Sequence, residues 1–431
     1  MSEATPPQGG FQSQRDLWRM PTWRRWVLAA TAVRLCATMM PFALLLAGQA
    51  ALGSFAAGAW MTSIYSAGAA LAAPFRGRAM DRSRLPDSLR PSLLALAGLC
   101  VAVSIASAIH APLPVLLVLS LLLGVIPAGA GGAYRALLPS FLPAGLLAPA
   151  FAIDAVLIEV TWITGPPLVG LVALAHSSLN LALIAVCALG AIGANLLMPP
   201  REPLPSSSAP GTGLDLAPFL RGLPLIVFVG VIVTGVSWGM VDSGLPPRLV
   251  QLGSRAELWG PLAALLSVTS AIGGLLNAGL ARPGSARQAL VRALVLLTIW
   301  SGFLLPLGFV EGVTGTALAL AAAGFPLAPL SGLLTYLLQQ ALPANRQAEG
   351  FSVYGACWSL GIGAGSALTA VLLEHSSARV ALMMSGVVPL AMVVLAALLS
   401  RPLLRAATRS SPPLTSAPEP APGEDAGAGS P

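Results

Sequence analysis

The feature that most constrains this chain is a series of apolar segments, each about 20 residues long. Twelve of them follow one another, at 26–48, 54–74, 91–110, 113–134, 149–174, 179–198, 223–245, 258–281, 289–310, 313–338, 350–373 and 380–400. A helix of about 20 residues crosses a hydrocarbon layer roughly 30 Å thick. Only 9% of the residues are charged, against about 25% in soluble domains. The sequence therefore predicts an all-α integral membrane protein with twelve transmembrane helices in a lipid bilayer.

An internal repeat divides the twelve segments into two sets of six. Phe151 aligns with Phe351 and Gly165 with Gly365, at a constant offset of 200 residues. Apolar helices resemble one another by chance, but matching turn residues at one offset favour duplication. A repeat this long in a hydrophobic chain predicts two related six-helix halves.

The remaining segments set the domain organisation. Residues 199–222 are rich in proline, serine and glycine, which is typical of a flexible linker. The last residues are rich in proline, alanine and serine, which favours disorder. The predicted domains are an N-terminal tail at 1–25, a first half at 26–198, the linker at 199–222, a second half at 223–404 and a disordered tail at 405–431.

The arginines indicate the orientation, because arginine gathers on the cytoplasmic side of membrane proteins. All 23 basic residues are arginine. With a cytoplasmic N-terminus, nineteen lie in inner segments and three, Arg248, Arg255 and Arg379, in outer segments, while Arg34 lies within a span. This predicts a multi-pass plasma membrane protein, of bacterial type, with both termini and the linker in the cytoplasm. The same reasoning makes a basic nucleic-acid-binding protein the weaker interpretation.

The loop after the second span contains Gly77-x-x-x-Asp81-Arg82. This pattern resembles the loop motif between the second and third helices of the major facilitator superfamily, although Ser83 stands where the family has a further glycine. The resemblance covers the whole chain except its tails. It implies a transporter in which two halves rock about a central site, and it implies a cytoplasmic gate at Gly77, Asp81 and Arg82. The alternative is a loop that only fixes orientation by its charge.

A second motif lies in the fifth span. Gly165, Pro166 and Gly170 resemble the Gly-Pro-x-x-Gly-Gly motif of the family's proton-coupled exporters, with Val169 replacing one glycine. Proline interrupts helical hydrogen bonding and glycine lets helices approach closely. The resemblance therefore favours export, and the alternative is a packing kink alone.

Ionisable side chains inside a span are costly and usually functional. Arg34 lies about 12 Å from the start of the first span, and Glu159 about 15 Å from the start of the fifth. Asp154 lies nearer the predicted cytoplasmic end of the fifth span. The repeat places Tyr354 and Ser359 opposite the two carboxylates, so the duplicated fold does not itself require acids there.

Arg34 and Glu159 are predicted to pair, because their depths are similar and family members place their helices side by side. An arginine stays protonated, so proton coupling would fall to Glu159, with Asp154 as the rival carboxylate. The alternative is a static ion pair that orders the first half.

Polar residues at helical spacing mark further cavity-lining candidates. In family members the first, fourth, seventh and tenth helices line the central cavity. The candidates are Thr31, Thr38, Thr234, Trp238, Asp242, Ser331, Thr335 and Gln339. So few polar side chains favour an amphipathic or hydrophobic substrate, and no charge cluster indicates strongly anionic cargo.

No catalytic motif, metal-ligand spacing or nucleotide-binding loop is found in the sequence, so no enzyme activity, metal or cofactor is expected. The sequence predicts a secondary active transporter, functional as a monomer, that exports a small amphipathic organic compound in exchange for protons. Uptake or uniport of a small solute is the alternative within this class. A membrane scaffold or sensor without transport is the alternative of another class, and the intramembrane charges argue against it.

Overall fold

The computed structural model describes residues 10–81, 85–175, 179–197, 219–278, 285–342 and 347–398. All regular elements in these ranges are helices. The all-α prediction is therefore confirmed for the described part of the chain.

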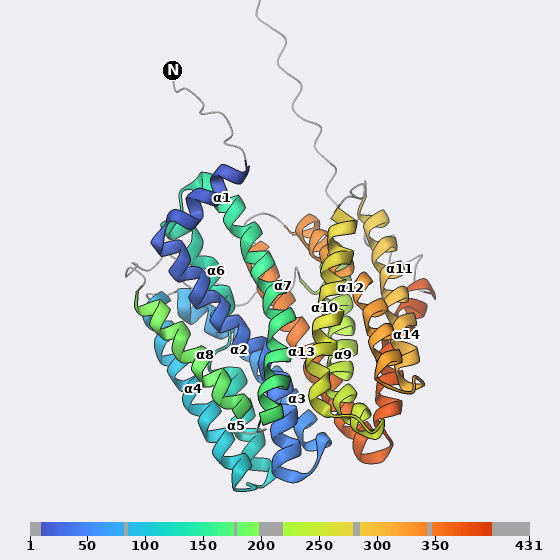
Figure 1. The fold of residues 1–431 in the computed structure, drawn as a ribbon. Coiled ribbons are helices and arrows are strands. Elements are labelled where there is room, and N and C mark those ends of the chain that lie inside the picture. The colour runs from blue at the N-terminus through green and yellow to red at the C-terminus, as the bar shows by residue number, and fades with distance from the viewer. Residues whose placement is uncertain are drawn as a thin grey trace, which may run out of the picture.

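The first half of the chain forms one bundle (Figure 1). Its helices are α1 (Gly10–Arg19), α2 (Pro21–Leu52), α3 (Phe55–Asp81), α4 (Leu85–Ala108), α5 (Leu113–Val125), α6 (Ala130–Phe141), α7 (Ala144–Ala175) and α8 (Leu179–Leu196). Within it, α2 packs against α3, α7 and α8, and α3 packs against α5.

The second half forms a bundle beside the first (Figure 1). Its elements are α9 (Gly222–Gln251), η1 (Ala256–Leu258), α10 (Trp259–Ala278), α11 (Ala286–Leu304), η2 (Leu305–Gly308), α12 (Val313–Ala341), α13 (Gln347–His375) and α14 (Ala378–Leu398). The two halves meet chiefly where α13 packs against α3 and where α10 packs against α7.

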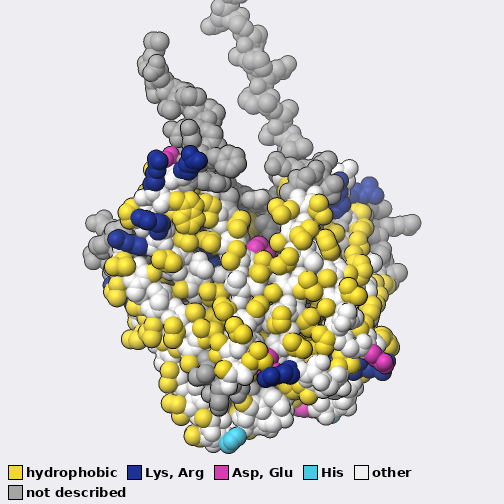
Figure 2. Space-filling view, in the orientation of Figure 1, with side chains coloured by type: hydrophobic (Ala, Val, Ile, Leu, Met, Phe, Trp, Pro, Cys, Tyr) yellow, Lys and Arg dark blue, Asp and Glu magenta, His cyan; other side chains and the backbone are white. Residues whose placement is uncertain are grey.

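Ten helices among the described residues are long and apolar enough to cross a membrane. Two helices at predicted spans fall outside this set. The apolar part of α8, Asn180–Leu196, is shorter, and α3 is rich in alanine, glycine and serine. Because α3 packs against helices of both halves, its composition suits close helix contact more than lipid contact. Figure 2 shows apolar side chains over the height of the molecule and basic side chains gathered mainly near the upper end.

The N-terminal segment is more ordered than its polar composition suggests. Within the predicted tail, α1 packs against α7 and α2, and Leu17 is fully buried. The first membrane helix then begins at Pro21, before the predicted start at residue 26. Proline suits a first helical position because its missing N–H would have no intrahelical partner there.

The span predicted at 113–134 coincides with an apolar stretch long enough to cross a membrane, Leu113–Arg135, but its helix is interrupted. It divides into α5 and α6 at residues 126–129. Pro127 lacks an amide hydrogen, and Gly129 adopts φ +81°, a conformation that favours glycine. The break therefore places the start of α6 inside the N-terminal bundle, and α6 continues to Phe141, beyond the predicted end.

Candidate functional site

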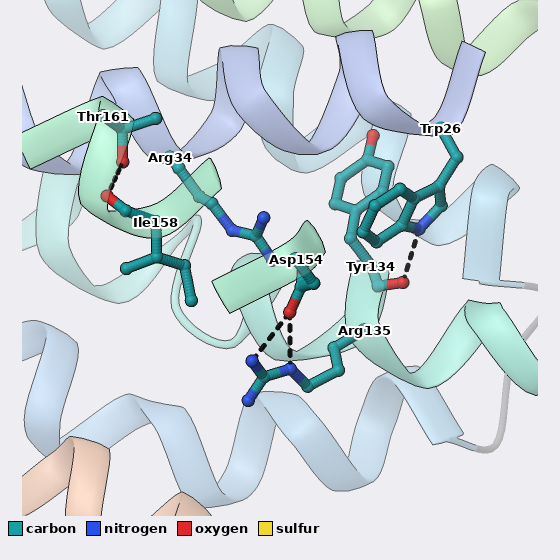
Figure 3. Close-up of polar contacts among 7 residues, drawn as sticks. All are labelled: Trp26, Arg34, Tyr134, Arg135, Asp154, Ile158 and Thr161. Atoms are coloured by element: carbon teal, nitrogen blue, oxygen red, sulfur yellow. Dashed lines mark hydrogen bonds and ion pairs between the residues drawn. The ribbon is translucent and has the colours of Figure 1, made fainter. Parts of the chain in front are cut away.

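Three charged side chains from different helices of the N-terminal half form one cluster (Figure 3). Arg34 of α2 donates through Nη2 to Oδ1 of Asp154 of α7 at 2.5 Å. Arg135 of α6 donates through Nε and Nη2 to Oδ2 of the same carboxylate, each at 2.7 Å. Asp154 is fully buried and Arg34 is 9% exposed, whereas the Arg135 side chain is 48% exposed. The carboxylate thus joins a buried cation to one at the edge of the bundle.

Aromatic packing holds Arg34 in this position. Its guanidinium lies 5.9 Å from the ring centroid of Trp26, which lies about two helical turns earlier on α2. The Trp26 indole donates to the backbone carbonyl of Tyr134 at 2.7 Å, and both aromatic side chains are fully buried (Figure 3). This hydrogen bond fixes α2 against α6, directly before Arg135.

A seam of close contacts continues from Asp154 along α7. Thr38 of α2 donates to the carbonyl oxygen of Thr161 at 3.1 Å. A methyl group at Gly165 would collide with the Thr38 side chain. Asp154, Thr161 and Gly165 therefore lie on the face of α7 that contacts α2.

Glu159 lies elsewhere on α7, so the predicted pairing with Arg34 is wrong. Five residues separate it from Asp154, a rotation of about 140° around a helix. Its face is shared with Trp162 and Pro166, both of which contact the C-terminal half. Depth along the helix suggested Glu159 as the partner, but the direction of the side chains selects Asp154. Glu159 is half-buried and makes no ion pair with any described residue.

A cavity of about 210 Å³ adjoins the charged cluster. Arg34 and Val33 of α2, Tyr65 of α3, and residues 127–131 line it. Ser359 of α13 also lines it, so the C-terminal half contributes to its wall. Ser359 is the repeat counterpart of Glu159.

The cavity-lining candidates of α2 and α9 have diverse environments. The hydroxyl of Thr31 is buried without a partner among the described residues, and Thr234 donates to Gly230 of its own helix. The Trp238 ring packs edge-on against Trp162 of α7, with centroids 5.7 Å apart. This aromatic pair joins the two halves near the middle of both helices.

The remaining polar candidates lie away from the charged cluster. Asp242 is buried and accepts a hydrogen bond from the Trp259 indole at 2.7 Å. On α12, Ser331 and Thr335 are hydrogen bonded to the side chain of Tyr354 of α13. Gln339 lies further along α12 and is exposed.

Contacts between the halves gather near the lower end of Figure 1, opposite α1. A methyl group at Gly170 of α7 would lie 2.5 Å from the carbonyl oxygen of Glu257, and one at Gly260 of α10 would lie 2.7 Å from that of Pro166. Nearby, the Trp60 indole of α3 donates to Glu374 of α13 at 3.0 Å. Glycine therefore lets α7 and α10 touch backbone to backbone at this end.

The loop motif lies at the edge of the described residues. The backbones of Gly77 and Asp81 belong to the end of α3, and Arg82 falls outside the described ranges. Sequence reasoning also missed Arg135, which it assigned to a cytoplasmic loop. The available signal was the repeat, because Arg135 lies 200 residues before the cavity candidate Thr335.

Two helical bundles around a cavity with buried charges define a membrane transport protein of the alternating two-half type. Residues 26–366 match the family profile of the Major Facilitator Superfamily, and the chain belongs to this family. Members of this family are transporters and are generally not enzymes.

Comparison with individual proteins is consistent with membership of this family. The chain is 24% identical over 382 residues to an uncharacterized MFS-type transporter, y4rN, of Sinorhizobium fredii, covering 84% of this chain and 91% of that protein. The nucleoside transporter NupG has a similar fold, with a TM-score of 0.69, 12% identity and coverage of 90% and 100% of the two chains. A bacterial homologue of the human lysosomal transporter Spinster, in an inward-facing and occupied conformation, also has a TM-score of 0.69, with 15% identity and coverage of 91% and 99%.

Proposed function

We propose that this transporter moves a small amphipathic organic compound by alternating access and couples export to proton entry. The observation that carries the proposal is the buried Arg34–Asp154 pair beside a cavity whose wall includes Ser359 of the other half. Charges buried at membrane depth are expensive and usually serve a substrate or ion pathway. A site that touches both halves changes its access when one half rocks against the other.

The positions of the inter-half contacts support a conformation that is closed at the lower end of Figure 1. The arginine distribution assigns that end to the outside and both termini to the cytoplasm of a bacterial plasma membrane. The contacts of Pro166 and Gly170 with α10 and η1 would form the outer seal. Opening the outer side would require these backbones to separate, while the cytoplasmic loop motif at Asp81 would close the inner side.

Glu159 remains the preferred proton carrier, for a reason different from its depth. Two arginines already compensate the charge of Asp154, so Asp154 needs no proton for neutrality. Glu159 has no cationic partner among the described residues, and its helix face meets the C-terminal half. Movement of that half would change the surroundings of Glu159 and so change its proton affinity. Arg34 and Asp154 would then act as a fixed pair beside the substrate.

Export in exchange for protons rests on the partial Gly165-Pro166-Gly170 motif, and uptake or uniport is the competing function. Transport assays on the protein reconstituted in liposomes distinguish between these functions. We expect a compound panel to show accumulation driven by an imposed proton gradient, with a monomer as the active unit. Flux that ignores the gradient would indicate a uniporter, and no flux of any compound would support a scaffold or sensor.

A further inference from the structure

The first turn of α6 opens onto the cavity beside Arg34. Gly129 precedes this helix and supplies no side-chain cap. Among the described residues, no backbone acceptor outside the helix is hydrogen bonded to the amides of Gly131 or Gly132. A methyl group at Gly131 would meet no atom within 4 Å, so there is open space beside this turn. Unpaired amides at a helix start, together with the helix dipole, favour an anion.

Arg34 provides an independent observation that points to the same ligand. Its side chain is about nine-tenths buried and lines the same cavity. Nη2 is bound to Asp154, but Nη1 is buried and has no hydrogen-bond partner among the described residues. A buried donor without an acceptor carries a desolvation cost. Because Arg34 lines the cavity, an acceptor atom that reached Nη1 from there would remove this cost.

The charge of the cluster also favours an anion. Arg34 and Arg135 contribute two positive charges, and Asp154 contributes one negative charge. The cluster therefore has one positive charge without a partner carboxylate among its own members. Asp154 cannot balance both arginines, and Glu159 makes no ion pair with either of them.

We propose that Arg34 Nη1 and the first-turn amides of α6 bind the carboxylate of an amphipathic organic anion, which names the substrate class of the transport function proposed above. A carboxylate has two acceptor oxygens, one for the guanidinium and one for the helix start. Val33, Met40 and Leu96 give the cavity apolar walls for the rest of the molecule.

The size of the cavity limits what it can hold. At about 210 Å³ it is smaller than the roughly 300–1,000 Å³ of drug-sized sites. In this conformation it suits a small aromatic or aliphatic acid, or the acidic end of a longer one. Ser359, which also lines the cavity, belongs to α13, so a bound acid would have residues of both halves around it.

The test uses benzoate as the probe and benzamide as its neutral analogue. Thermal unfolding of the purified full-length protein is followed in detergent, with sodium benzoate replacing sodium chloride at constant ionic strength. We expect benzoate to raise the unfolding temperature and benzamide to leave it unchanged. Equal shifts with both compounds, or no benzoate shift at millimolar concentrations, would overturn the carboxylate site.

Matched variants locate the binding. Gly131→Asp places an internal carboxylate at the helix start, where there is room for it and where the dipole favours it. Gly131→Asn has the same size without the charge. We expect G131D to weaken benzoate binding about tenfold or more and G131N to change it by less than about threefold. Parental affinity in G131D would place the acid elsewhere.

A second variant protects the test against a folding defect. Arg34→Gln removes the unpartnered donor, while Asp154 keeps its hydrogen bonds to Arg135. We expect R34Q also to weaken benzoate binding about tenfold or more. Parental affinity in R34Q would exclude Arg34 from the site. Binding in detergent does not depend on transport, so a protein that moves neutral compounds but ignores benzoate refutes this inference and leaves the transport function standing.

Discussion

Asp154 and Tyr354 lie at equivalent positions of the two halves, and each is hydrogen bonded to a partner at another equivalent position. Asp154 is bound to Arg135, and Tyr354 is bound to Thr335, with 200 residues separating both matched pairs. The duplicated fold therefore keeps the contact and changes its chemistry. The ionic contact between Asp154 and Arg135 lies next to the cavity that Arg34 lines. The corresponding contact in the C-terminal half, between Tyr354 and Thr335, joins uncharged side chains.

Asp154→Asn should destabilise the folded protein by about 3–5 kcal/mol, because it leaves Arg34 buried without its counter-charge. Arg34→Gln in the same chain restores the parental charge balance, so the double variant should recover much of the loss. Thermal unfolding and the yield of monodisperse protein measure both effects. Additive losses in the double variant would show that the two residues act independently.

The topology can be tested in the linker, which lies outside the described residues. A cysteine at Ser207 should react with a membrane-impermeant reagent only after the cytoplasmic side is exposed, because arginine enrichment assigns the linker to that side. The four native cysteines are first replaced, so that the reagent can react only with the cysteine at position 207. Labelling of intact cells at Ser207 would contradict the orientation.

Asp81→Asn tests the cytoplasmic gate. A carboxylate can stabilise a helix start, and the motif would use it to hold the halves together on the inner side. Transport should therefore fall much more than the amount of folded protein in the membrane. Equal losses in transport and in folded protein would make Asp81 a folding residue instead.

Gly260→Val tests the proposed outer seal. The added side chain would start 2.7 Å from the carbonyl oxygen of Pro166, so α7 and α10 could no longer touch. The outward-closed state should become less populated, and transport should decrease. Accessibility of a cysteine at Trp162 to an impermeant reagent from outside should increase. Gly302→Val is the control, because a methyl group there would meet nothing within 4 Å.

Periodicity and the repeat predict most of this fold, because each membrane helix needs its own apolar stretch. The break between α5 and α6 has local signals in Pro127 and Gly129, but their sequence also suits close packing in a continuous helix. Comparable prolines, Pro326 and Pro329, lie inside the continuous helix α12. Which proline breaks a helix thus depends on its surroundings as well as its type.

The charged cluster was harder to predict than the fold. Arg34, Arg135 and Asp154 lie on separate helices, so no local spacing brings them together. Similar depth suggested Glu159 as the partner of Arg34, yet a helix turns about 100° per residue and directs Glu159 toward the other half. The position of a residue along its helix determines the depth of its side chain in the membrane. The direction of the side chain depends on how the helix packs against its neighbours.

Glu159→Gln tests proton coupling directly. Glutamine keeps the size and polarity of the side chain but cannot take up a proton at physiological pH. If Glu159 carries the proton, transport driven by a proton gradient should be lost, while exchange of labelled for unlabelled substrate across the membrane should continue. Exchange needs only the rocking of the halves around the loaded site, and the Arg34–Asp154 pair beside the cavity is unchanged in this variant. Glu311→Gln is the matched control, because Glu311 is exposed in the segment between η2 and α12. Parental accumulation against a gradient in E159Q would exclude Glu159 as the coupling site, whereas loss of both activities would make it a residue needed for the rocking motion itself.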